Sequence, residues 1–295
     1  MRFDPAQLET LLAIVEEGTF DAAARRLHLT PSAVSQRVRA LEGAAGQVLL
    51  RRTTPATATP AGEPLLRLAR QHRLLEEEAA AALGGDRVGD LAVAVNADSL
   101  ATWFRPVLTA VAERGGTAIR LHVEDQAYSH KLLQRGEVLA AVTSQPDPVQ
   151  GCTVEPLGAL RYTPAAAPEL IERHRRGRRL DRATLPMVLF NEKDHLQDEV
   201  LGGARPPVVH RVPSAADFYE AIRCGLGWGM LPHGQLAEGV ARREIARLPG
   251  SRAVDVPLFW QRWRLGSDAL ATLTDDVRRA ARRGLRRAAP TPDPR

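Results

Sequence analysis

The chain has 295 residues, of which 44% are hydrophobic and 25% charged, as in a soluble globular protein with two or three compact units. Only 4% are aromatic, so a large stacking platform for single-stranded nucleic acid is excluded. Two cysteines, Cys152 and Cys224, exclude a disulfide framework and a cysteine-based metal site of usual spacing. We find neither a secretion signal nor an apolar run of about 20 residues, and therefore expect a cytoplasmic protein without a membrane segment.

The formal net charge is +5, and only two of the 40 basic residues, Lys131 and Lys193, are lysines. Because arginine is used almost everywhere, an isolated arginine run indicates little. Arginines at positions 278, 279, 282, 283, 286, 287 and 295 alone exceed the net charge. This C-terminal end is either a solvated helix face with a proline-rich tail or a second DNA contact.

The N-terminal part contains three helical patterns. Residues 5–17 carry leucines at helical spacing and end at Gly18. A second helix is expected at residues 21–27. A third starts at Thr30 and Pro31, because threonine caps a helix and proline suits its first position. The face of this helix opposite its apolar residues carries small and polar side chains, as a helix that reads the major groove requires.

Positive charge is concentrated around this third helix and the basic hairpin that follows it. Residues 25–52 contain six arginines against one carboxylate, Glu42, and clustered arginines neutralise phosphates or pair with guanine. The alternative is a three-helix packing unit with a solvated arginine face. We predict a winged helix-turn-helix DNA-binding domain at residues 1–58. Its candidate DNA contacts are Thr30, Ser32, Ala33, Ser35, Gln36, Arg39, Arg51 and Arg52.

A long helical segment follows at residues 62–83. An apolar seam with alternating three- and four-residue steps runs along it, as in a coiled coil. The seam includes Leu65, Leu68, His72 and Leu75. We predict that residues 59–87 form a dimerisation helix, which would let two recognition helices reach two DNA half-sites. The alternative is a helix packed on its own domain.

Beyond residue 88, short apolar runs alternate with helical patterns, which indicates α/β lobes with parallel sheets, as in periplasmic solute-binding proteins. The expected strands are residues 91–95, 119–123, 139–143, 187–190, 207–212, 228–231 and 258–265. The expected helices are residues 100–114, 127–136, 168–175, 215–224 and 267–287, the last packing on the first lobe. A break near residues 162–168 separates two lobes. We predict lobe I at residues 88–163 plus 265–290, lobe II at 164–264 and a tail at 291–295.

Polar residues follow the predicted strands at the edge where α/β folds bind ligands. Carboxylates there would hold an amino group or a second cation, hydroxyls at helix starts would suit a ligand carboxylate, and a tryptophan could cover an alkyl chain or a cation. For each serine the alternative is a simple helix cap. The site suits an amino acid with a basic side chain. The candidates are Asn96, Asp98, Ser99, Trp103, Glu124, Asp125, Thr143, Ser144 and Ser214.

No catalytic or metal-binding pattern stands out. The glycines of residues 225–229 follow a helix and precede a strand, which is the reverse of a dinucleotide fingerprint. The eight histidines lack paired metal spacing, and no nucleophile elbow or cysteine–histidine dyad is present. We expect neither an enzyme nor a bound cofactor.

The run AARRLHLTPSAVSQRVRALE…GQVLLRRTTPATATPAGEPLL is similar to the N-terminal signature of LysR-type transcriptional regulators, in its SAVSQ core, its GQ-x-LL-x-R wing and its T-x-AG helix start. It departs at residues 43–45, Gly-Ala-Ala, where the family has a bulkier residue before the glycine, so the end of the recognition helix is less defined. The resemblance covers nearly the whole chain. It implies a homodimer or homotetramer that binds duplex DNA and contacts RNA polymerase, away from membranes.

The stretches VNADSLATWF, VEDQ, RGEVLAAVTSQ, LGALRY, LFNEKDHLQ and LFWQRWRL resemble the arginine- and lysine-responsive ArgP/LysG branch of this family. The resemblance implies that the effector is L-lysine or L-arginine and that the target gene encodes a basic-amino-acid exporter. It adds His195, in LFNEKDHLQ, to the candidate effector residues. Two other functions stay open: an architectural DNA-binding protein without effector, such as a replication-origin blocker, and a solute-binding receptor.

Overall fold

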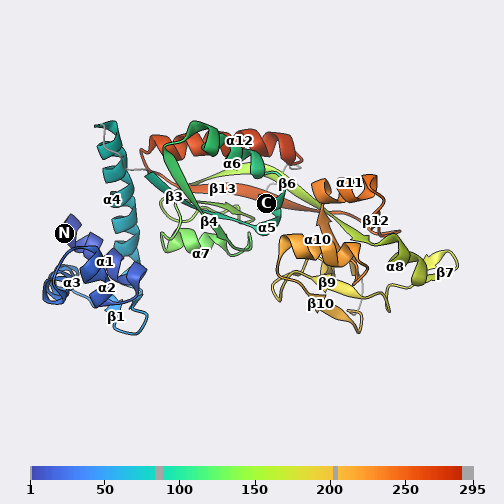
Figure 1. Cartoon of the computed structure of the whole chain (residues 1–295), viewed down its shortest axis with the longest axis horizontal. Coiled ribbons are helices and arrows are strands. Elements are labelled where there is room, and N and C mark those ends of the chain that lie inside the picture. Colours follow the sequence, from blue (N-terminus) through green and yellow to red (C-terminus); the bar gives the residue numbers. More distant parts are fainter. Residues whose placement is uncertain (1, 84–88, 202–204, 288–295) are drawn as a thin grey trace, which may run out of the picture.

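The computed structural model describes residues 2–83, 89–201 and 205–287, and consists of a helical N-terminal part and an α/β part (Figure 1). The long helix α4 (Glu63–Ala82) stands between them. This confirms the predicted fold class. In these three described ranges, no helix is both long and apolar enough to span a bilayer.

Three helices and a short hairpin build the N-terminal part. They are α1 (Pro5–Glu17), α2 (Phe20–Arg26), α3 (Pro31–Ala45), and the antiparallel strands β1 (Leu50–Arg51) and β2 (Thr57–Ala58). Their shared core includes Leu11 and Leu12 of α1 and Val34, Val38 and Leu41 of α3. The spacing that predicted these helices therefore reflects the packing of one small core.

Side-chain caps define where these helices begin. The carboxylate of Asp4 accepts from the N–H groups of Ala6 and Gln7, and the hydroxyl of Thr30 accepts from the N–H of Ala33 at 3.2 Å. His28, with a φ of 54°, occupies the left-handed region and makes the turn between α2 and α3. This turn fixes the angle at which α3 leaves the domain.

The α/β part contains one large mixed sheet, in the order β11-β6-β13-β5-β3-β4, with β12 also pairing with β6. Strands β3, β4 and β5 are parallel, whereas β6, β11, β12 and β13 join in antiparallel fashion. The strands are β3 (Gly89–Val95), β4 (Thr117–Val123), β5 (Ala140–Thr143), β6 (Cys152–Ala166), β11 (Gly229–Pro232), β12 (Ala246–Arg247) and β13 (Val254–Trp263). Parallel sheets were expected, whereas this sheet is mixed and only β3, β4 and β5 pair in parallel within it.

The longest strand, β6, was not anticipated, and it runs through most of the expected break at residues 162–168. Its sequence contains Pro156, Gly158 and Pro164, residues that weaken a strand pattern. Pairing with β13 along its length compensates, with a register shift between Leu258 and Phe259. Both strands run from one lobe into the other (Figure 1).

Helices cover the sheet in both lobes. They are α5 (Ala97–Ala101), α6 (Arg105–Arg114), α7 (Ser129–Gln134), α8 (Pro168–Arg173), α9 (Asp198–Leu201), α10 (Ala215–Arg223), α11 (His233–Ala241) and α12 (Asp268–Gly284). The single helix expected at residues 100–114 is instead α5 and α6, because the backbone turns at Thr102. Helix α12 packs against α6 on the first lobe, as expected (Figure 1).

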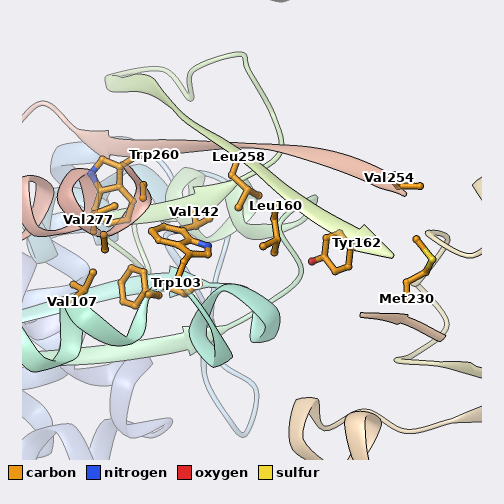
Figure 2. Packing of buried hydrophobic residues seen from close by; sticks show 14 of the residues in the cluster. Trp103, Val107, Val142, Leu160, Tyr162, Met230, Val254, Leu258, Trp260 and Val277 are labelled. Carbon is orange, nitrogen blue, oxygen red and sulfur yellow. The ribbon is translucent and has the colours of Figure 1, made fainter. Parts of the chain in front are cut away.

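The second lobe adds two small strand pairs. Strands β9 (Met187–Leu189) and β10 (Val209–Arg211) are parallel, and β7 (Arg175–Arg176) and β8 (Arg179–Leu180) are antiparallel. One hydrophobic core continues from lobe to lobe. Figure 2 shows Trp260 near Val277 of α12 at one end of this core, and Leu160, Tyr162 and Met230 leading toward the second lobe.

Candidate DNA interface and effector pocket

Exposed residues of α3, of its cap and of the hairpin carry the candidate DNA contacts, and we call this set the DNA-facing surface. Ser32, Gln36 and Arg39 are exposed on α3, while Ala33 and Ser35 are half-buried. Thr30 is exposed at the cap, and Arg51 and Arg52 are exposed at the hairpin. Most of the candidate DNA contacts are therefore accessible to solvent.

Only some of the nearby arginines are free to meet phosphate. Among the described residues, no carboxylate forms an ion pair with Arg39 or Arg51. Arg26, by contrast, is paired with Glu16 at 2.8 Å and with Glu17 at 3.2 Å. Burial would raise the pKa of Glu16, but hydrogen bonds and charges from Arg73 and Arg26 outweigh burial and lower it. Arg26 is therefore engaged in ion pairs within the N-terminal domain.

The end of the recognition helix is better defined than its sequence indicated. Helix α3 continues through the small residues to Ala45, and Gly46, with a φ of 67°, closes it in the left-handed conformation. The carboxylate of Glu42 accepts from the N–H of Leu49 at 2.9 Å and so ties α3 to the hairpin. The departure from the family sequence does not shorten the helix.

Helix α4 shows which residues of the predicted seam point outward. Leu68 and Leu75 are 39% and 41% exposed, and His72 is half-exposed, with Nδ1 3.4 Å from a carboxylate oxygen of Glu76. Leu65 is only 7% exposed and belongs to the core of the N-terminal domain. The outward seam therefore begins after Leu65.

An acidic pocket lies where the two lobes meet. It is lined from the first lobe by the start of α5 and the end of β4, and from the second by the loop after β9, by α10 and by β11. Four carboxylates line it, and none of its lining residues is basic. The lining is Asn96, Ala97, Asp98, Val123, Glu124, Asp125, Gln126, Tyr162, Phe190, Asn191, Asp194, Leu196, Phe218 and Met230.

Asp98 is the most perturbed acid in this pocket. Its Oδ2 accepts a hydrogen bond from the hydroxyl of Tyr162 at 2.8 Å. Burial, together with the charges of Asp194 and Asp125, raises the pKa of Asp98 to about 6, against the lowering effect of the hydrogen bond from Tyr162. A cation close to this buried carboxylate would stabilise its ionised form.

The other acids are held by backbone groups. Oδ1 of Asp125 accepts from the N–H of Ala127 at 2.7 Å, and Oδ2 of Asp194 accepts from the N–H of Phe190 at 2.9 Å. Burial raises the pKa of Asp125, and the charges of Glu124 and Asp194 add to this effect. Each carboxylate keeps a fixed position and has capacity for a further donor.

Asn96 supplies a neutral acceptor. Its side chain is only 4% exposed, and its Oδ1 has no hydrogen-bond partner among the described residues. Because a buried acceptor without a partner is costly, a ligand N–H would satisfy it. The pocket therefore offers hydrogen-bond acceptors and negative charge to a small cation.

The structure brings together Asn96, Asp98, Glu124 and Asp125 of the candidate effector residues, and it places the others outside the pocket lining. Thr143 is buried, and so is Ser99, whose hydroxyl has no partner within the described part of the chain. The N–H of Ser144 donates to the carbonyl of Gln126 at 3.0 Å. The hydroxyl of Ser214 caps α10 and accepts from the N–H of Asp217 at 3.4 Å.

Two further candidates also lie elsewhere. His195 is exposed, with Nδ1 3.3 Å from Asp198. Trp103 is 4% exposed and packs edge-on against Phe104 in the core (Figure 2). It lines a separate hollow of about 460 Å³, whose rim carries Arg105 and Arg242.

Sequence reasoning missed Tyr162 and Asp194. Tyr162 lies on the strand that was not predicted, and its place at the end of the stretch LGALRY, which resembles the ArgP/LysG branch, was the available signal. Asp194 is next to His195 in the stretch LFNEKDHLQ. The available signal was that it is an acidic residue in a stretch that resembles the ArgP/LysG branch. Within the described ranges, no group of histidine, cysteine and acidic residues could hold a metal ion.

Comparison with known proteins shows which family the chain belongs to. Residues 5–63 match the bacterial regulatory helix-turn-helix protein model of the lysR family, and residues 84–282 match the LysR substrate binding domain. The lysine export transcriptional regulatory protein LysG of Corynebacterium efficiens is 48% identical, over 96% of this chain and 99% of its own.

Two solved structures are also similar over nearly their full length. Full-length LysG from Corynebacterium glutamicum with bound effector Arg has 48% sequence identity and a TM-score of 0.82, covering 96% of this chain and 100% of that chain. ArgP from Mycobacterium tuberculosis has 43% identity and a TM-score of 0.88, covering 98% and 100%. The chain therefore belongs to the LysR family of bacterial transcriptional regulators.

Proposed function

We propose that this protein binds duplex operator DNA through its DNA-facing surface, senses L-arginine or L-lysine in its acidic pocket, and controls a gene for a basic-amino-acid exporter. The single observation that carries the sensing role is the pocket of four carboxylates without a basic lining residue. It acts in the cytoplasm, where the chromosome lies, and signals by binding, without catalysis.

The pocket's chemistry supports a basic amino acid over a neutral one. A zwitterionic ligand with a neutral side chain brings one ammonium group and one carboxylate, and that carboxylate would meet an acidic wall. A second cation on the side chain adds favourable interactions with Asp98, Glu124, Asp125 and Asp194. The similar regulator from C. glutamicum holds arginine as its effector, which agrees with this reasoning.

The DNA role is supported by the exposed guanidinium groups of Arg39 and Arg51 and by the exposed amide of Gln36. Arginine pairs bidentately with guanine or phosphate, and glutamine pairs with adenine. We further propose that Leu68 and Leu75 of α4 meet a second copy of the chain, giving a dimer that assembles into a tetramer and contacts RNA polymerase. The exposure of both leucines supports this.

Calorimetry with matched ligands tests the sensing role. Full-length protein is titrated with L-arginine, L-lysine and their uncharged analogues L-citrulline and L-norleucine. We expect heat and saturation with the two basic amino acids and at least roughly tenfold weaker binding of the analogues, since about 1.4 kcal/mol corresponds to tenfold. Equal binding of citrulline and arginine would contradict a role for the carboxylates.

Selection of bound sequences from random duplexes, at fixed salt, tests the DNA role. We expect an enriched site with two related half-sites, as a dimer requires. Binding without sequence preference and without response to any basic amino acid would favour the architectural protein. Amino-acid binding without affinity for duplex DNA would favour the solute-binding receptor.

A further inference from the structure

The two lysines of the chain contact the same aromatic ring. Nζ of Lys193 lies 4.4 Å from the ring centroid of Tyr128, and Nζ of Lys131 lies 4.9 Å from it. Every other basic residue in the sequence, 38 of the 40, is an arginine. The two ammonium groups therefore share one place, beside the acidic pocket, in a chain that otherwise uses guanidinium.

Of the two, Lys193 joins the lobes. It belongs to the loop after β9 in the second lobe, and its Nζ lies 3.3 Å from Oε1 of Glu124, which follows β4 in the first lobe. Asn191 and Asp194 of the same loop line the pocket, as does Glu124 itself. The contact therefore links the two lobes beside the pocket and engages one of the four carboxylates that line it.

The strength of this contact is limited by its exposure. The side chains of Lys193 and Glu124 are 45% and 35% exposed, and such pairs contribute little because water screens them. An ammonium is a compact, strongly hydrated point charge, whereas a guanidinium would hold a carboxylate bidentately and stack on a tyrosine ring. Lysine at this position thus gives a contact that a ligand can displace.

The charge of Lys193 also reaches the interior of the pocket. Burial raises the pKa of Asp125, and Lys193 is among the groups that lower it. Lys193, next to the pocket, therefore already supplies part of the positive charge that an effector would bring to these carboxylates. The side chain of Lys193 and that of a lysine effector carry the same chemical group.

We propose that Lys193 is an internal competitor of the effector: its ammonium holds Glu124 when the pocket is empty, and the cationic side chain of a basic amino acid displaces it. This rests on the proposed sensing function. Lys193 thereby sets the affinity for the effector and disfavours amino acids without a second cation, because these cannot replace the contact that they break.

Calorimetric titration of full-length variants with L-arginine tests this role. In Lys193→Met the competitor is absent, so we expect affinity about three- to fivefold higher, the scale of an exposed ion pair. In Lys193→Arg a stronger competitor keeps the charge, so affinity should fall about fivefold. Lys131→Met and Lys131→Arg are the matched controls, because Lys131 contacts the same ring without pairing with Glu124, and they should stay within about twofold of wild type.

The outcomes separate the two levels of the proposal. If wild-type protein binds no basic amino acid, the sensing function itself fails. If wild type binds but Lys193→Met binds equally or more weakly, Lys193 is not a competitor. Equal shifts in Lys131→Met and Lys193→Met would show a general effect of rim charge and would also overturn the assignment. Thermal unfolding of each variant confirms that it is folded.

Discussion

The guanidinium groups of Arg39 and Arg51 are exposed to solvent and have no ionic partner among the described residues. The carboxylates of the acidic pocket, by contrast, lie close together and are partly buried. The first arrangement suits a polyanion, because many exposed charges each contribute a small, salt-dependent amount. The second suits one small cation, because a few desolvated charges contribute strongly. One chain thus contains two solutions to charge recognition, and substitutions should affect them differently.

The largest effect should come from the pocket. Asp98→Asn keeps the shape and the hydrogen bond from Tyr162 but removes the charge. We expect it to weaken arginine binding by about 2–5 kcal/mol, the usual cost of removing one partner of a buried charge pair. Calorimetry measures the change. Glu192→Gln, an exposed acid outside the pocket lining, is the control, and an equal loss there would contradict local recognition by Asp98.

The DNA-facing surface should respond less to a single change. We expect Arg39→Ala or Gln36→Ala to weaken operator binding by about 1–3 kcal/mol, and Gln36→Ala to relax the base preference. A mobility-shift assay at several salt concentrations measures both. Arg242→Ala removes an exposed arginine that follows α11 directly, remote in sequence from α3. If it reduced binding as much as Arg39→Ala, affinity would reflect total charge.

These two regions also differ in how far the sequence predicts them. Helices α1 to α3 follow from leucine spacing, from the cap at Thr30 and from Pro31, all of which act within a few residues. The polar residues Asn96, Asp98, Glu124 and Asp125 were found because they follow strands whose carboxyl ends share one edge. Local pattern and sheet geometry sufficed for both.

The rest of the pocket depends on contacts that are distant in sequence. Tyr162 reaches Asp98 because β6 pairs with β13, and no local pattern predicts this pairing. Asp194 enters the pocket because its loop is folded by hydrogen bonds to Phe190 and Gln197. Trp103 was misplaced because the turn at Thr102 directs it into the core. The sequence alone does not show in which direction a side chain in a loop or turn points, and this direction decides whether it lines the pocket.

The negative charge of Asp98 should also lower the free energy of unfolding of the ligand-free protein. Its pKa of about 6 in the folded protein lies above the ordinary value of 3.8, so ionisation destabilises the folded state above pH 6, and the penalty disappears as the pH falls toward 4. Asp98→Asn should therefore stabilise the protein at pH 7 by about 1–3 kcal/mol. Thermal unfolding of the ligand-free protein measures this. A lower melting temperature would mean that the charge supports the fold.

The smallest expected effect distinguishes the two regions by pH. When the pH falls from 7 to 5, Asp98 passes its pKa of about 6 and becomes mostly neutral, and the raised pKa of Asp125 acts in the same direction. Arginine affinity should therefore fall about tenfold, since a proton and the ligand compete for the same carboxylate. Arginine side chains stay charged throughout this range, so the contribution of Arg39 to DNA binding should not change.

Calorimetry at pH 5, 6 and 7, in buffers of different ionisation heat, should detect proton release on binding at pH 5. An affinity for arginine that stays constant over this range would mean that the ligand's cation is held by carboxylates of ordinary pKa and that Asp98 has only a structural role.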